Sequence, residues 1–352
     1  MNRRYFPEFS SEPQYKSPAF QSAIEPTPVP ITALYDILSY QRFADTPGEK
    51  AMIAKYLYTL PDVREDEAGN IWVWVGENPT TMFSSHTDTV EKKTAQGRKK
   101  VTVGNGYAYI RDGGVLGADC GTGIWIMLNL IAAKVPGVYV FHREEECGGH
   151  GSLHAAKHHA NLLEGAKRCI AFDRKSTSHI ITYQSGGRCC SDEFADALAA
   201  ALNDGTGFTF AGNDGGTFTD SANYTHLIPE CTNLSVGYYD QHTKDECQDL
   251  TFVSALVNKL IAIDWESLPA VRDPAVVEED EFDYRKWYGA YVSRHASDEP
   301  EPGKGGSTPT HDDMVQAIID FPDEVADILA TLGYRPSDLL EELKFTYDCD
   351  IR

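Results

Sequence analysis

Short apolar runs alternate with amphipathic segments along residues 31–263. Runs rich in apolar, β-branched and aromatic residues predict strands over 71–75, 81–85, 107–111, 137–142, 169–172, 180–184 and 231–236. Apolar residues at helical spacing predict helices between 31 and 60 and over 121–133, 150–159, 192–202 and 249–263. This alternation is typical of an α/β domain. We therefore expect a mixed, mostly parallel central sheet with helices on both faces.

The two ends of the chain differ from this alternating middle. Residues 1–30 carry six prolines without a clear period, which predicts an irregular N-terminal arm. Residues 269–310 combine an acidic segment with a linker rich in glycine and proline, and helical spacing returns over 311–352. We expect one domain over 31–268, followed by the linker and a small helical C-terminal appendage.

Charge narrows the classes of function. The 352 residues include 53 acids and 31 bases, for a formal charge of −22. Such a field repels phosphate, which argues against nucleic acid and anionic membranes as partners. The chain has neither an apolar run long enough to span a bilayer nor an apolar segment behind Arg3 and Arg4. Its eight cysteines do not form a disulfide framework at this length, so we expect free thiols and a cytoplasmic location.

Acids and histidines stand where several predicted strands end, the edge at which open α/β sheets bind ligands. They are His86, Asp88, Asp119, the run 144–146, Asp173 and His242. Singly, each has an ordinary explanation: a chance surface pair, a helix cap, a solvated charge run or a loop residue. Asp112 competes with Asp119 but lies in a turn-like Arg-Asp-Gly-Gly. Clustered acids repel one another unless a cation lies among them.

Together the motifs are specific. S-H-T-D-T-V at 85–90, G-A-D-C-G-T-G at 117–123, E-E-E-C-G-G-H-G-S at 144–152 and I-P-x-x-x-N-L-S-V-G-Y-Y-D-x-H at 228–242 resemble the zinc-dependent exopeptidase superfamily. The resemblance covers about residues 35–265. Asp119 lies 31 positions after Asp88, and His242 lies 69 after Asp173, so neither interval holds the inserted domain of other branches. The chain looks most like the compact single-domain aminopeptidases of the bacterial leucyl aminopeptidase and aminopeptidase Y type.

This resemblance implies a metal-ligand set. His86 would bind one ion and His242 a second, Asp119 would bridge both, and Glu146 and Asp173 would each complete one set. Three carboxylates and two imidazoles suit divalent ions of this kind, zinc most often. The resemblance further implies a cis peptide bond after Asp119.

The same resemblance implies a general base and its support. Glu145 would be the base and Asp88 would hold His86, although Glu144 makes the register of the acidic run ambiguous. Related enzymes usually have an acid or amide where this chain has Cys120. The thiol could change the metal preference, make the enzyme sensitive to oxidation or only fill space.

Other side chains are weaker candidates. Four of them could contact substrate, either by lining the pocket or by donating to the tetrahedral oxyanion: Thr217, Asp220, Tyr238 and Tyr239. A helix start or plain packing would explain them equally well. His154, His158 and His159 have helical spacing and could bind metal, but an exposed helix face is the favoured interpretation.

The leading hypothesis is a cytoplasmic di-zinc aminopeptidase that removes N-terminal residues from peptides. One alternative keeps the metals and changes the substrate to that of a carboxypeptidase, a dipeptidase or an N-acyl-amino-acid deacylase. The other is a catalytically silent scaffold that acts through its C-terminal helices. The complete set of ligands and base argues against the scaffold. The oligomeric state is left open.

Overall fold

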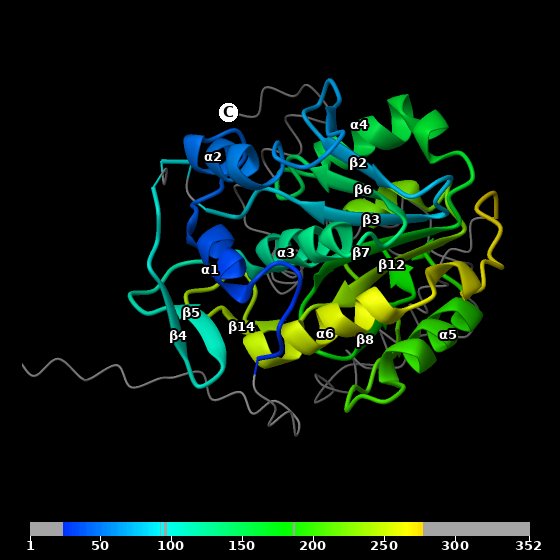
Figure 1. Cartoon of the computed structure of the whole chain (residues 1–352). Coiled ribbons are helices and arrows are strands. Elements are labelled where there is room, and N and C mark those ends of the chain that lie inside the picture. Colours follow the sequence, from blue (N-terminus) through cyan, green and yellow to red (C-terminus); the bar gives the residue numbers. More distant parts are fainter. Residues whose placement is uncertain (1–23, 92, 95–96, 186, 277–352) are drawn as a thin grey trace, which may run out of the picture. The chain divides into compact units, whose positions relative to one another are not determined.

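A central sheet organises the part of the chain that the computed structural model describes, residues 24–276 apart from 92, 95–96 and 186 (Figure 1). The predicted arm over 1–23 and the segment from 277, with the helical appendage, lie outside the described residues. Eight strands form the sheet in the order β1 (Arg64–Glu65), β2 (Ile71–Val75), β6 (Gly137–His142), β3 (Thr81–His86), β7 (Arg168–Arg174), β12 (Glu230–Ser235), β8 (His179–Ile181) and β11 (Ala211–Asn213).

The middle of this sheet is parallel. Strands β6, β3, β7 and β12 run in one direction, while β2 and β8 pair with their inner neighbours antiparallel. The register places His86 beside His142, and Ser235 beside Arg174. The carboxyl ends of these four strands therefore meet at one edge of the sheet.

Helices cover both faces, and the expected fold class is confirmed. They are α1 (Ile31–Ser39), α2 (Pro47–Tyr56), α3 (Ala118–Ala132), α4 (His150–His158), α5 (Asp192–Asn203) and α6 (Leu250–Ala262), with short 3-10 turns η1 (Ala160–Leu163), η2 (Asp220–Tyr224) and η3 (Trp265–Ser267). Alternation along β6 divides the core into two layers. Tyr139 and Phe141 pack in the cluster that contains α3, whereas Val138 and Val140 pack with Ala155 of α4.

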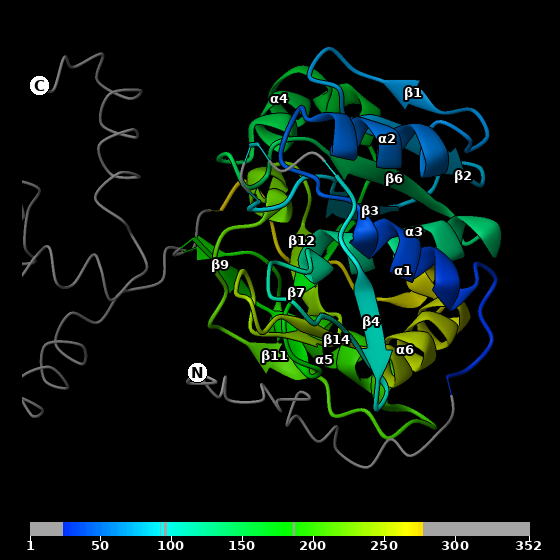
Figure 2. The same ribbon diagram turned by 90° about the vertical axis from the view of Figure 1, so that its left-hand side faces the viewer.

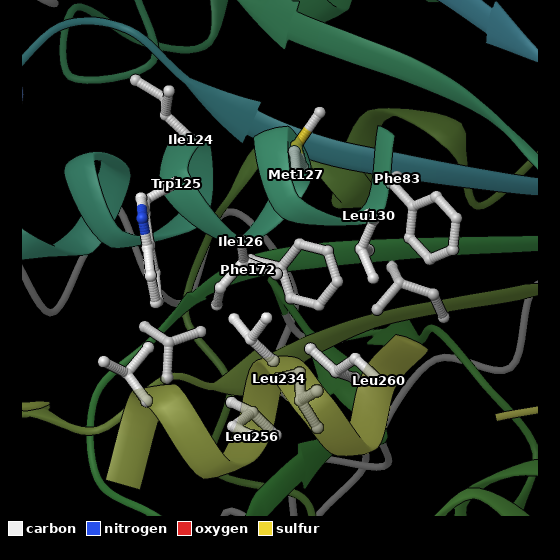
Figure 3. Packing of buried hydrophobic residues seen from close by; sticks show 14 of the residues in the cluster. Phe83, Ile124, Trp125, Ile126, Met127, Leu130, Phe172, Leu234, Leu256 and Leu260 are labelled. Atoms are coloured by element: carbon white, nitrogen blue, oxygen red, sulfur yellow. The ribbon is translucent and has the colours of Figure 1, made fainter. Parts of the chain in front are cut away.

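The larger core lies between the sheet and helices α3 and α6. Phe83 and Phe172 stack with ring centroids 5.9 Å apart, and Leu130 of α3 and Leu260 of α6 close over them (Figure 3). Gly123 permits this approach, because a Cβ there would lie 2.3 Å from the carbonyl oxygen of Phe172. The helix can therefore lie directly on the carboxyl-terminal half of the strands.

A smaller sheet lies beside the edge at which the carboxyl ends of the four parallel strands meet. It has the order β13 (Tyr238–Tyr239), β14 (Cys247–Asp249), β5 (Tyr107–Ile110) and β4 (Val101–Gly104), and its β4–β5 hairpin contacts α1 and α6 (Figure 2). A short hairpin pairs β9 (Tyr183–Gln184) with β10 (Gly187–Arg188). No helix among the described residues is long and apolar enough to cross a membrane.

The structure also refines the predicted elements. The strand 137–142 has the expected bounds, whereas the run 180–184 is divided between β8 and β9. Strands β1, β4, β10, β11, β13 and β14 were not predicted. All but β4 have two or three residues, which is too short to show an alternating pattern, and β4 has only four.

Candidate metal centre

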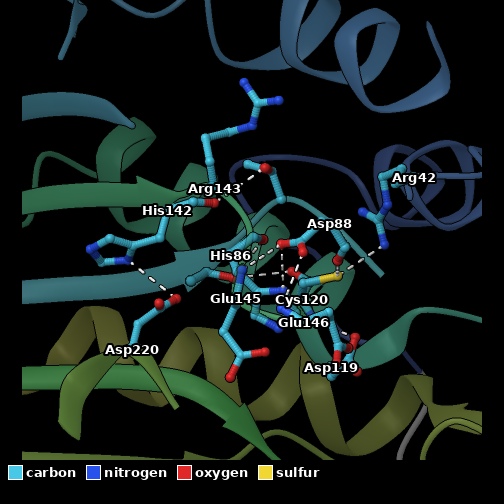
Figure 4. A network of polar contacts seen from close by, with 12 residues as sticks. Arg42, His86, Asp88, Asp119, Cys120, His142, Arg143, Glu145, Glu146 and Asp220 are labelled. Carbon is cyan, nitrogen blue, oxygen red and sulfur yellow. Dashed lines mark hydrogen bonds and ion pairs between the residues drawn. The ribbon is translucent and has the colours of Figure 1, made fainter. Parts of the chain in front are cut away.

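His86 stands at the end of β3 and is almost fully buried. Its Nδ1 lies 3.4 Å from Oδ1 of Asp88, and its Nε2 lies 3.8 Å from Oδ1 of Asp173, which comes from the neighbouring strand β7. The two ring nitrogens thus face two different carboxylates. Asp88 lies on the Nδ1 side of the ring, and Nε2 is directed at the centre (Figure 4).

Asp88 also holds the loop that carries the paired glutamates. Its Oδ1 accepts the backbone N–H of Glu145 and its Oδ2 that of Glu146, both at 3.1 Å. The loop turns through Glu144, whose φ of +59° is left-handed, and its side chain lies 3.2 Å from Nδ1 of His150. Glu145 and Glu146 line the pocket at this edge, and Glu144 does not. This placement favours the expected register.

Asp119 lies in the first turn of α3 and is buried. Its Oδ1 accepts the backbone N–H of Cys120 at 2.7 Å, which leaves Oδ2 directed at Nε2 of His242, 2.9 Å away. The turn before it needs a glycine, because Gly117 has a φ of +68° and a Cβ there would lie 2.6 Å from the side chain of Thr89. Asp119 thus reaches the centre from a helix start.

The expected cis bond after Asp119 is wrong: no peptide bond among the described residues is cis. Asp119 is already within the helix, and the hydrogen bond from the backbone of Cys120 orients its carboxylate instead. The competing Asp112 is exposed in a turn and is not among the residues that line the pocket.

His242 completes the centre from the loop between β13 and β14. Its Nε2 lies 2.9 Å from Oδ2 of Asp119 and 2.9 Å from Oε1 of Glu146. The donor atoms of these three residues lie within 4.8 Å of one another, as do those of His86, Glu145 and Glu146. The structure therefore brings together all five predicted ligands and the predicted base, from the three elements β3, α3 and β7 and from two loops.

The centre carries an excess of acid. Burial raises the pKa of Glu145 well above its ordinary value and that of Glu146 to about 7. Burial opposes charge on His242, but its contacts with Asp119 and Glu146 outweigh this and raise its pKa to about 11. Burial would likewise raise the pKa of Asp119, yet His242 holds it below the ordinary value. Carboxylates gathered in this way are stabilised by cations.

The residues fit divalent metal ions. Asp119, Glu146 and His242 could hold one ion, and His86 with Asp173 could hold the other, with Asp119 between them. Imidazole and carboxylate are the donors that suit zinc. Burial, and to a smaller extent the charge of Asp119, raises the pKa of Glu146, and bound cations would favour its ionised form.

Cys120 lies behind the centre. Its Sγ donates to the carbonyl of Asp88 at 2.9 Å and receives Nη2 of Arg42 at 3.2 Å. Burial raises the pKa of this thiol well above its usual value. Although Cys120 lies near His86 and Asp119, it does not line the pocket. These contacts favour a packing role for the thiol.

The four predicted substrate contacts separate in space. Thr217 lines the pocket. Asp220 lies at the start of η2, with its Oδ2 3.4 Å from Nδ1 of His142 (Figure 4). Tyr238 is buried and donates its hydroxyl to the carbonyl of Asp173 at 2.8 Å, while Tyr239 pairs with Cys247 in the small sheet. The last three do not line the pocket.

Sequence reasoning missed several residues at the centre. Arg174, Lys175, Phe218 and Gln241 line the pocket, and each lies within two positions of a predicted site residue, which is the signal that was available. Glu246 accepts the backbone N–H groups of Leu116 and Ala118 at 2.8 and 2.7 Å, and so supports the turn before Asp119. Nothing in its local sequence indicates this.

No protein-family model matches the sequence, and no curated protein matches it. Solved structures do. The chain is similar to aminopeptidase PepT from Bacillus cereus, with a TM-score of 0.54 and 16% identity over 66% of this chain and 96% of that one. It is similar to the TET1 peptidase of Pyrococcus horikoshii, with a TM-score of 0.53 and 14% identity over 66% of this chain and 98% of that one. It is also similar to a tripeptidase from Staphylococcus aureus, with a TM-score of 0.50 and 16% identity over 66% of this chain and 95% of that one. At these identities the likeness shows a shared fold.

Proposed function

We propose that the chain is a co-catalytic di-metal exopeptidase, an aminopeptidase that removes N-terminal residues from peptides. The observation that carries this proposal is the convergence of His86, Asp119, Glu146, Asp173 and His242 at one pocket beside Glu145. The peptidase fold of the similar structures supports it. We assign the catalytic domain to residues 31–268 and expect the enzyme in the cytoplasm.

The metal ions have two tasks in this proposal. When bound, two zinc ions would polarise the scissile carbonyl and lower the pKa of water. Asp119, Glu146 and His242 would hold one of them, and His86 and Asp173 the other.

Glu145 acts as the general base. Its carboxyl lines the pocket, is not needed as a ligand and has a pKa raised by burial, so it can accept a proton from water and pass it to the departing amine. Asp88 positions it through the backbone.

The pocket also indicates what the substrate carries. Arg174 and Lys175 line it directly after Asp173, and the guanidinium of Arg174 donates to the carbonyl of Gly215 at 2.9 Å. Two cations beside a metal centre favour a substrate with a carboxylate near the scissile bond. A short peptide meets that requirement, and so does the substrate of a dipeptidase, carboxypeptidase or deacylase. We retain this group as the second candidate.

A panel of five substrates separates the candidates: a free dipeptide, an N-acetyl amino acid, and three tripeptides with both ends free, the N-terminus acetylated or the C-terminus amidated. An aminopeptidase cleaves the free and the amidated tripeptide but not the acetylated one. A dipeptidase cleaves the free dipeptide only, a carboxypeptidase accepts the acetylated tripeptide, and a deacylase hydrolyses the N-acetyl amino acid. The zinc-loaded enzyme is compared with Glu145→Gln. Lack of hydrolysis of every substrate by protein that holds two zinc ions would overturn the enzymatic proposal.

A further inference from the structure

A second group of metal-binding side chains lies away from the pocket. Glu67 comes from the turn between β1 and β2, His154 from α4, and His159 from the residue that follows α4. One carboxylate oxygen of Glu67 lies 2.9 Å from Nε2 of His159 and 3.6 Å from Nε2 of His154. None of the three residues lines the pocket.

The spacing of these donors suits a tetrahedral ion. Two ligands that are each 2.0–2.1 Å from a tetrahedral zinc lie about 3.3 Å apart. The two distances from Glu67 are close to that value, and all three donor atoms lie within 4.8 Å of one another. Two imidazoles and one carboxylate are a donor set that zinc uses with an open fourth position.

One donor atom of the group lacks a hydrogen bond. Nε2 of His154 is buried and has no hydrogen-bond partner among the described residues. At 3.6 Å the oxygen of Glu67 is too far for a normal hydrogen bond, although the ring nitrogen faces it. A buried polar nitrogen without a partner costs free energy, and a shared ion would satisfy it.

The surrounding rings hold the two imidazoles in place. His154 and His158 are one turn apart on α4, with ring centroids 4.6 Å apart. His159 meets the indole of Trp72 edge to face, with centroids 6.3 Å apart and an interplanar angle of 70°. Because Trp72 belongs to β2, the group joins the sheet, the β1–β2 turn and the end of α4. The sequence favoured an exposed helix face, but the turn that carries Glu67 lies against that face.

We propose that Glu67, His154 and His159 form a further site for a divalent transition ion, with zinc as the expected ligand. Ca²⁺ and Mg²⁺ prefer oxygen donors and would not compete at two imidazoles. The ion ties the β1–β2 turn to α4. That turn already supports the catalytic loop, since Asn70 accepts the backbone N–H of Arg143 at 3.0 Å and donates to the carbonyl of Gly151 at 2.9 Å.

The number of bound ions tests the site independently of peptidase activity. The full chain and its variants are equilibrated with zinc, dialysed against low free zinc and analysed for metal. We expect His159→Ala and Glu67→Gln each to hold one ion per chain fewer than the wild type. The matched control His226→Ala changes an exposed histidine outside the group and should lose none. Because the Glu67 side chain is 76% exposed, its substitution should leave the fold intact.

Tryptophan emission provides a second readout. Cu²⁺ bound at His159 would lie close to Trp72 and quench it, so the wild type and His226→Ala should show a saturable loss of emission that His159→Ala and Glu67→Gln lack. Equal zinc content and equal quenching in all four proteins would overturn the proposal and leave an ordinary ion pair between Glu67 and His159.

Discussion

The carboxylate of Asp88 accepts the backbone N–H of Glu145 at 3.1 Å. Its other oxygen accepts the N–H of Glu146 at the same distance, and His86 lies 3.4 Å away. One buried side chain therefore connects a metal-ligand candidate at the end of β3 to the loop that carries Glu145, the proposed base. Two adjacent strands of the sheet depend on it for the geometry of their ends.

Replacing Asp88 with asparagine should weaken the centre. The amide has one acceptor oxygen where the carboxylate has two, so one backbone N–H of the loop loses its partner and His86 loses a charged neighbour. We expect zinc affinity to fall about 10–100-fold, the usual effect of removing a group that orients a ligand. Competition with a chelator measures it. Asp112→Asn, at an exposed turn, is the control, and unchanged affinity in Asp88→Asn would contradict the supporting role.

Replacing Glu145 with glutamine should stop proton transfer while the ligands remain. We expect kcat to fall at least about 100-fold, the low end for positioned acid–base catalysis. Bound zinc should be unchanged, which elemental analysis checks. Glu144→Gln is the matched control, because Glu144 faces His150 instead of the pocket. A large loss in Glu144→Gln with little in Glu145→Gln would reverse the assignment.

The stability of the domain should depend on where the chain is truncated at its C-terminal side. The backbone N–H groups of Val271 and Arg272 donate to the buried carboxylate of Glu230 at 2.7 and 3.1 Å. Arg272 also donates to the carbonyls of Pro229 and Ile228. A chain that ends at residue 276 retains these contacts, and one that ends at 267 lacks them.

We expect the shorter chain to be less stable by roughly 2–4 kcal/mol, since it loses several hydrogen bonds to charged groups. Urea unfolding of the two chains measures the difference. Equal midpoints would show that residues 268–276 add nothing to the domain.

Asp36 should contribute stability that depends on pH. Burial works to raise its pKa, but hydrogen bonds from Lys55, Tyr56 and Arg98 outweigh burial and lower it. An acid whose pKa is lowered by folding stabilises the protein above its unfolded pKa, and this contribution is lost as the pH falls through the folded value. Asp36→Asn should therefore cost about 1 kcal/mol at pH 7, given its partial exposure, and progressively less below about pH 4.

Urea unfolding of Asp36→Asn at a series of pH values measures this contribution. Asp214→Asn, at an exposed loop position, serves as the control and should show no such trend. A cost for Asp36→Asn that stays constant as the pH falls would argue against the ion cluster.

The sequence was informative about the centre because its residues are tied to strand ends. His86 and Asp173 close runs of apolar residues, and parallel strands carry such ends to one edge whatever else surrounds them. The acidic run 144–146 follows β6 for the same reason. Local pattern therefore predicted the α/β class and the strand-end candidates, and the family resemblance of the motifs implied which side chains form the set.

Only the tertiary structure decided which neighbours each of these residues has. Glu246 reaches the start of α3, Asp220 faces His142, and Glu67 lies against His159, in each case across a long stretch of chain. Such contacts depend on how two elements pack, and neither element's own pattern of apolar and polar residues specifies its partner. The same packing oriented Asp119 through a helix start where the sequence predicted a cis bond. The periodicity of apolar residues and the motifs determined where the strands end. The close packing of separate elements determined the distances between the side chains at those ends.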